Sequence, residues 1–163
     1  MNKKLRAVML MLAALIMISV TGCSLSSQIT NAAWESVNTY TIGSAAVNYR
    51  ITFESDTNYK VEMYQTFSSS DTVYSTAKGT YTIDGDEITF QCSETTIDYT
   101  STYVTEALIG AGWYGYDLFP YEEGDSVTLT CKKDKYRILL LSYDALYFTD
   151  SSGSQYIFTE VDD

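Results

Sequence analysis

The stretch Gly79-Thr-Tyr-Thr-Ile83-Asp-Gly-Asp-Glu-Ile88-Thr-Phe90-Gln-Cys92 predicts a β-hairpin together with its register. The turn is centred on Gly85-Asp86, and pairing Ile83 with Ile88 places the apolar residues of both strands on one face. That face carries Tyr81, Ile83, Ile88, Phe90 and Cys92, with Tyr81 opposite Phe90 and Gly79 opposite Cys92. The other face carries Thr80, Thr82, Thr89 and Gln91. A slip by one residue would turn one apolar set away from the other, so the pattern specifies this register.

A second hairpin is predicted over Leu146-Tyr-Phe148-Thr-Asp-Ser-Ser-Gly-Ser-Gln-Tyr156-Ile-Phe158. A three-residue loop, Ser151 to Gly153, puts Gly153 at the position that favours a left-handed backbone. Phe148 then lies opposite Tyr156, and Leu146 opposite Phe158. Again a single apolar face results.

The chain after residue 33 is rich in residues that favour strands. Thr, Tyr, Val, Ile and Phe dominate it, and turn residues recur about every 8 to 14 positions, a spacing typical of an all-β sandwich or barrel. We therefore expect one all-β domain over residues 34–163. Its strands are predicted near residues 34–41, 48–54, 59–67, 72–83, 87–94, 126–132, 135–142, 145–150 and 154–161.

Residues 95–124 break this alternation and form the one irregular insertion. Residues 102–111 are predicted as a short helix, and glycines and aromatic residues follow it. Long irregular segments in small domains are often functional. The aromatic side chains either contact a ligand at the mouth of the domain or plug one end of it, and the sequence leaves both alternatives open. The candidate ligand-binding residues are Trp113, Tyr114, Tyr116, Phe119 and Tyr121.

The first 22 residues have the layout of a secretory signal peptide. Positive residues at the start precede a run, Ala7 to Val20, in which only Ser19 is polar. The run is short for a membrane span, which argues against an uncleaved anchor helix. The residues Val20-Thr-Gly-Cys23 resemble the bacterial lipobox, which implies cleavage before Cys23 and a diacylglycerol on its sulfur. The alternative is an ordinary signal with a chance cysteine.

Lipidation of Cys23 would fix the protein to the bacterial cell envelope, facing the periplasm or the cell exterior. Residues 23–33 then form the lipidated cysteine and a small polar tether. Cleavage leaves 141 residues with seven basic and 21 acidic side chains, a net charge of −14. Such a charge repels anionic headgroups, so we expect the domain to hang from its acyl chains and not to lie on the bilayer.

Composition excludes several classes of function. The acidic excess argues against nucleic-acid binding, and the absence of His excludes Ser-His and Cys-His nucleophile pairs and the usual zinc and copper sites. Asp84 to Glu87 resembles a calcium loop only superficially, because an EF-hand needs ligands over twelve residues. Carboxylates also occur at Glu122, Glu123 and Asp125, but acids at strand ends are usually solvated. We expect no metal, no cofactor and no enzyme activity.

Two cysteines remain in the mature chain, Cys92 and Cys131. Each continues an alternating apolar pattern, so both thiols are predicted to point towards the core. An even number of cysteines outside the cytoplasm favours a Cys92–Cys131 disulfide. The alternative is two buried free thiols that pack as small apolar side chains.

The lipobox, the tryptophan of Ala33-Trp34-Glu35-Ser36 and the nearly continuous hairpins resemble the small lipocalin-like (calycin-type) lipoproteins of bacteria. The chain departs from the family at Ala32, where lipocalins have Gly. The resemblance implies a closed, antiparallel up-and-down β-barrel of about eight or nine strands. It implies no agreed activity, since fold alone does not give function.

Two functions follow as expectations. The first is a non-enzymatic barrel that binds a small apolar or aromatic molecule, or an envelope component. The second is a structural or protein-interaction module whose barrel is filled by its own side chains. Eight-stranded barrels occur in both forms. The sequence identifies no protein partner.

Overall fold

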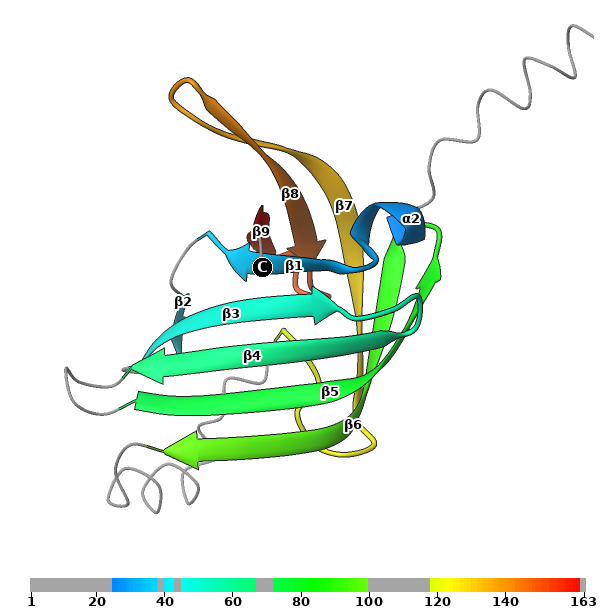
Figure 1. The fold of residues 1–163 in the computed structure, drawn as a ribbon, viewed down its shortest axis with the longest axis vertical. Helices are drawn as coiled ribbons and strands as arrows, with labels where there is room; N and C mark the ends of the chain where they lie inside the picture. Colours follow the sequence, from blue (N-terminus) through cyan, green and yellow to red (C-terminus); the bar gives the residue numbers. More distant parts are fainter. Residues whose placement is uncertain (1–24, 38–39, 43–44, 67–71, 100–117, 162–163) are drawn as a thin grey trace, which may run out of the picture.

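The computed structural model describes residues 25–37, 40–42, 45–66, 72–99 and 118–161. These residues form one short helix, α2 (Leu25–Ile29), and the strands of a single sheet (Figure 1). The strands are β1 (Ala32–Ser36), β2 (Tyr40–Ile42), β3 (Ala45–Phe53), β4 (Asn58–Thr66), β5 (Thr72–Asp84), β6 (Glu87–Tyr99), β7 (Ser126–Ile138), β8 (Leu141–Thr149) and β9 (Gln155–Val161).

The sheet is a closed antiparallel ring. Its strand order is β1-β9-β8-β7-β6-β5-β4-β3-β2, and β1 also pairs with β3. Trp34 lies opposite Glu160 of β9 on one side of β1 and opposite Ile51 of β3 on the other. The expected up-and-down β-barrel is therefore confirmed, with eight strands in the ring and the short β2 beside β3.

The first predicted hairpin has the predicted register. Ile83 pairs with Ile88, Tyr81 with Phe90 and Gly79 with Cys92. Gly85 in the turn has a positive φ of 65°, a conformation that glycine adopts without a steric penalty. Beyond Cys92 the register shifts, because Lys78 pairs with Glu94 and Ser93 is the extra residue of a β-bulge.

The second predicted hairpin is also confirmed. Phe148 pairs with Tyr156 and Leu146 with Phe158. The loop between them is closed by a hydrogen bond from the Asp150 N–H to the Ser154 carbonyl (3.1 Å), and Gly153 has a φ of 87°. Local turn chemistry was therefore sufficient to predict this connection.

The prediction was wrong between residues 132 and 145. The sequence suggested two strands, 126–132 and 135–142, with a break between them. The structure has one strand, β7, that continues to Ile138 and turns back through Leu139-Leu140 into β8. The last part of β7 lies beyond the barrel wall, so it has no buried face and shows no alternation of apolar and polar residues. In the same way, the predicted strand 34–41 is divided between β1 and β2.

The described part of the predicted tether is packed onto the barrel. Leu25–Ile29 form α2, and the side chain of Ile29 is fully buried. The Asn31 N–H donates to the Phe53 carbonyl (2.8 Å), which fixes the entry into β1. The described residues ahead of Trp34 therefore pack as part of the barrel domain. Within the described ranges, no helix has the length and apolar character needed to span a bilayer.

The antiparallel order assigns each connection to one end of the barrel. The α2 end holds α2, the β3–β4 turn, the β5–β6 turn and the last residue of β9, and β7 leaves the barrel wall at this end. The far end holds the β8–β9 loop, Asp150–Ser154. Figure 1 shows α2 beside the β5–β6 turn and shows the β7–β8 hairpin projecting past the rest of the barrel.

Candidate functional site

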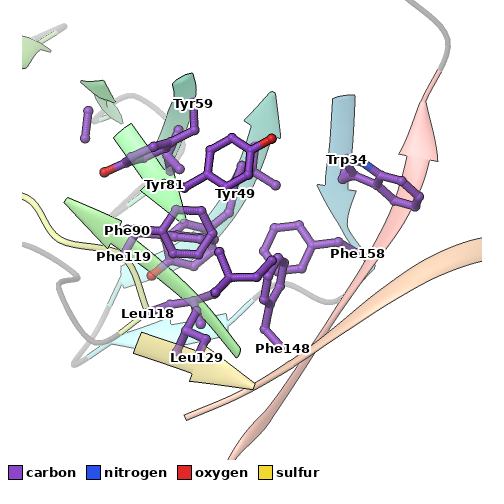
Figure 2. Packing of buried hydrophobic residues seen from close by; sticks show 14 of the residues in the cluster. Trp34, Tyr49, Tyr59, Tyr81, Phe90, Leu118, Phe119, Leu129, Phe148 and Phe158 are labelled. Atoms are coloured by element: carbon purple, nitrogen blue, oxygen red, sulfur yellow. The ribbon is translucent and has the colours of Figure 1, made fainter. Parts of the chain in front are cut away.

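The barrel interior is occupied by a cluster of aromatic rings (Figure 2). Phe119, from the insertion, lies at its centre and is 1% exposed. Its ring centroid is 5.3 Å from that of Phe90, 5.9 Å from Phe148 and 6.1 Å from Phe158, all in edge-to-face geometry. Tyr49 contacts it from β3 at 5.9 Å. Aromatic pairs in this geometry stabilise a core beyond the area they bury.

Tyr121, the second candidate that the structure describes, is also buried. Its hydroxyl donates to the Ser75 Oγ (2.8 Å), and its carbonyl accepts a hydrogen bond from the Thr95 hydroxyl. Burial raises the pKa of Tyr121 above its ordinary value, so the ring stays neutral in the core. The Tyr121 side chain therefore links the insertion to β5 through a hydrogen bond inside the barrel.

Backbone hydrogen bonds hold the end of the insertion where β7 would otherwise continue. β7 pairs with β6 only from Glu87 to Gln91. The next residue of β6, Cys92, donates its N–H to the Asp125 carbonyl and accepts from the Gly124 N–H, both at 2.9 Å. Gly124 has a φ of 93°, which turns the chain into the barrel. Leu118 to Tyr121 are consequently all buried.

The other candidate ligand residues, Trp113, Tyr114 and Tyr116, lie outside the described residues, as do Cys23 and the predicted helix 102–111. The two that are described act together as a plug. The sequence left open whether these aromatic side chains contact a ligand or pack inside the barrel. Phe119 and Tyr121 both pack within the core.

The two ends of the interior differ in polarity. Towards the α2 end, the rings of Phe53, Tyr81 and Phe90 contact one another, with Phe53 and Tyr81 edge to face. Towards the far end, Gln65 and Ser75 are buried polar side chains, and Gln65 Nε2 lies 3.6 Å from the Met63 sulfur. Polar side chains inside a barrel need internal partners, and Tyr121 supplies one to Ser75.

Among the surface hollows on the described part of the molecule, three lie outside the barrel. A hollow of about 470 Å³ on β7, β8 and β9 is lined by Asp86, Thr130, Lys132, Asp134, Tyr147, Thr149 and Gln155. One of about 290 Å³ lies between Val37 and the β7–β8 hairpin, and one of about 240 Å³ lies beside Arg50. Among the described residues, no three His, Cys, Asp or Glu side chains gather closely enough to hold a metal ion.

The predicted Cys92–Cys131 disulfide is wrong, because both thiols are free and buried. The β6–β7 register explains why. Cys131 donates its N–H to the Asp86 carbonyl, whereas Cys92 donates to Asp125, so the cysteines lie at opposite ends of the ladder. At roughly 3.4 Å per residue they are about 20 Å apart. A disulfide requires Cα atoms within about 7 Å. Burial raises the pKa of the Cys131 thiol to about 12.

Sequence analysis missed the most unusual surface of the molecule, the tip of the β7–β8 hairpin, Ile138–Leu141. Leu139 is 98% exposed and Leu140 is 100% exposed. Leu139 also has a φ of 54°, a conformation that disfavours a branched side chain. The available signal was the run Ile138-Leu-Leu-Leu141, which lies entirely within the predicted strand 135–142.

Basic residues flank this tip. Lys132, Lys135 and Arg137 are exposed on β7. Lys132 pairs with Asp134 (3.2 Å) and Lys135 with Asp144. Lys133 turns towards the barrel instead, where its Nζ donates to the Gln28 carbonyl (3.1 Å) and lies 5.0 Å from the centroid of the Trp34 ring. Lys133 thus ties the base of the hairpin to α2 and β1.

Comparison with models of known protein families gives no match, and no curated protein matches the chain either. The function is therefore argued from the geometry described above.

Proposed function

We propose that this chain is a lipid-anchored, non-enzymatic lipoprotein of the bacterial cell envelope, and that its filled barrel acts through its outer surface. The observation that carries the proposal is the position of Phe119, whose ring is surrounded by four other rings in the barrel. An eight-stranded barrel has room either for its own side chains or for one small ligand. Phe119 stands where such a ligand would lie.

A carrier of a small apolar or aromatic molecule is the rival function. To admit that molecule, the barrel would have to release Leu118–Tyr121 from the interior. Release would break the Tyr121–Ser75 hydrogen bond and leave the buried Ser75 hydroxyl without its partner. The cost of this step favours the structural or protein-interaction module over the carrier.

The anchor part of the proposal rests on the N-terminal sequence. A positive segment and an apolar run end in the lipobox-like residues before Cys23. The described chain begins two residues later, at Leu25 in α2, and enters the barrel at once. Attachment at Cys23 would consequently hold the barrel close to the bilayer. The lipocalin-like lipoprotein family remains part of this proposal, supported by the closed up-and-down topology.

Native mass spectrometry of the protein purified from its own envelope tests the filled barrel. We expect the mass of the acylated mature chain, alone or with a protein partner, and no bound small molecule. The denatured protein is the control, because unfolding releases a non-covalent ligand but retains covalent acyl chains. A discrete additional mass that disappears on unfolding would contradict the filled barrel and support the carrier.

A further inference from the structure

The β7–β8 hairpin presents two leucines to solvent at the end of a rigid ladder. Antiparallel pairing continues without interruption from Thr130–Thr149 to Ile138–Leu141, so the hairpin is an ordered ladder up to its two-residue turn. The Leu139 and Leu140 side chains are almost completely exposed. Burying a leucine side chain stabilises the folded state by roughly 1.5 to 3 kcal/mol. In the isolated domain, the two exposed leucines do not contribute this stabilisation.

Charge is distributed very unevenly between this hairpin and the rest of the domain. Four of the seven basic residues that follow Cys23 lie between Lys132 and Arg137. The hairpin segment Lys132–Asp144 contains only two acidic residues, so it carries a net charge of +2 on a mature chain of −14. The expectation that the domain is repelled by anionic headgroups therefore holds for the whole molecule on average, but not for this projection.

The base of the hairpin lies beside α2, the element that follows Cys23 in the chain. Lys133 links the base of the hairpin to α2 through its hydrogen bond to Gln28. The tip itself lies beside Ser36 and Val37, at the other end of β1, and Figure 1 shows it well apart from α2. A membrane anchor attached two residues before Leu25 would hold α2, and with it the base of the projecting hairpin, close to the bilayer.

We propose that the tip Ile138–Leu141 inserts into the headgroup region of the bilayer that holds the anchor, with Leu139 and Leu140 at the acyl boundary and the exposed Lys135 and Arg137 on lipid phosphates. The inference rests on the proposed lipid anchor. Stable attachment of a lipidated protein usually needs more than one membrane signal, and apolar insertion combined with basic residues is a second one.

The small apolar area of the tip favours a bilayer over a protein partner. A stable protein–protein interface buries roughly 800 Å² on each partner. Two exposed leucines at the tip of a narrow hairpin offer much less than that. A bilayer needs no complementary groove, because lipids rearrange around an inserted tip.

A fluorescent label placed at the tip tests the proposal on the acylated protein. The variant Leu140→Cys is labelled with an environment-sensitive fluorophore and bound to vesicles of phosphatidylethanolamine and phosphatidylglycerol. Ser151→Cys, in the β8–β9 loop at the far end, is the matched control. Cys92 and Cys131 are only 2% exposed, so they compete little for the label. We expect a blue shift, and quenching by nitroxide lipids, at position 140 only.

Two outcomes would overturn the proposal. If the label at position 140 stays in water while the protein is vesicle-bound, the anchor holds but the tip does not insert. If position 140 is shielded without vesicles, the tip is covered by a second copy or another protein. Failure of the anchor is distinguished beforehand, because the purified protein would lack the mass of acyl chains.

A second variant separates apolar insertion from damage to the hairpin. Leu139→Gly/Leu140→Ser supplies the glycine that a positive φ at the first turn residue favours, so the turn is retained. The comparison uses a chain that begins at residue 24, which contains every described strand and carries no acyl group. In this chain, the variant should bind the same vesicles at least about tenfold more weakly than the parent sequence does. The control Tyr64→Ser removes an exposed aromatic from the barrel wall and should bind as the parent chain does. Equal binding by the tip variant would contradict insertion.

Discussion

Gly79 lies where β5 comes closest to β6. A Cβ atom built at this position would overlap the Gln91 carbonyl oxygen, and the Cys92 backbone is also in contact. The close approach coincides with the bulge at Ser93. Sequence analysis placed Gly79 opposite Cys92 correctly, but no pattern of residues could show how near the two backbones are. The requirement for glycine here is a property of the bulge and not of the turn.

Gly79→Ala should be among the most destabilising single substitutions in the barrel. The overlap is with backbone, which cannot rotate away, so we expect a loss of about 3 kcal/mol or more in the free energy of unfolding. Urea denaturation measures it. Gly85→Ala is the control: it also adds one methyl group, but nothing lies within 4 Å of it, so only the left-handed φ is penalised. That variant should lose about 1 kcal/mol. Equal losses would contradict the role of the close approach.

Phe119→Ala distinguishes packing from ligand contact at the insertion. A buried Phe truncated to Ala costs roughly 3 to 5 kcal/mol. We expect a melting temperature lowered by many degrees, with Phe119→Leu intermediate because it keeps most of the volume. A Phe119→Ala variant that melts like the parent chain but loses a co-purifying ligand would support the carrier instead.

Buried ionisable groups predict alkaline sensitivity. The Cys131 thiol has a pKa of about 12 in the folded chain against an ordinary 9.0, and burial also raises the pKa of Tyr59 and Tyr121. Because a raised pKa favours the protonated form, this contribution to stability is complete below pH 9 and is lost as the pH rises towards 12. Unfolding free energies measured by urea across this range should fall, and less steeply in Cys131→Val. A flat profile would contradict the burial of the thiol.

At the scale of elements, the two hairpins predicted correctly have turns that lie at the barrel wall. Their strands alternate because one face meets the core, and Gly85 and Gly153 mark the turns. The β7–β8 hairpin lacks both signals. Its outer part has solvent on each face, and Leu139 occupies a turn position where glycine is expected. The insertion posed a different difficulty, since Phe119 contacts residues of β3, β6, β8 and β9 that are far away in the sequence.

Leu139→Gly should stabilise the isolated domain. A non-glycine residue in a left-handed conformation costs about 1 to 2 kcal/mol, and the exposed leucine contributes no packing that offsets it. Glycine loses part of this gain through backbone entropy, so we expect a net increase of about 0.5 to 1 kcal/mol. Thermal unfolding measures the change. Leu140→Gly, at the neighbouring turn position, is the control and should not stabilise the domain.

At the scale of the whole molecule, the basic hairpin and the otherwise acidic surface give the domain an uneven distribution of charge. Three of the mature chain's basic residues, Arg50, Lys60 and Lys78, lie outside the hairpin, and Arg50 and Lys60 form ion pairs with Glu62. The rest of the surface is predominantly acidic. In the proposed anchored protein, this uneven distribution would turn the basic hairpin towards an anionic bilayer and the acidic surface away from it. The net charge of the chain does not reveal this uneven distribution.

Cys23→Ser should release the protein from membranes. Without acyl chains, only the hairpin tip remains to bind lipid, and a single weak signal gives reversible attachment. We expect loss of acyl labelling and a shift to the soluble fraction after a high-salt wash, followed by immunoblotting. The Ser24→Ala variant is the control and should remain in the membrane fraction. Membrane retention of Cys23→Ser after the wash would contradict the anchor.

Closure of the ring by β1 has a consequence for the order in which the chain folds. Trp34 and Glu160 are neighbours across β1 and β9, although nearly the entire mature chain separates them in sequence. Contacts of such long range form late, because the intervening chain must first be ordered. Until the C-terminal strand is synthesised, β1 and β8 each retain an unpaired edge. A chain interrupted before Gln155 would therefore not be a smaller barrel but an open sheet, exposed to pairing with other chains.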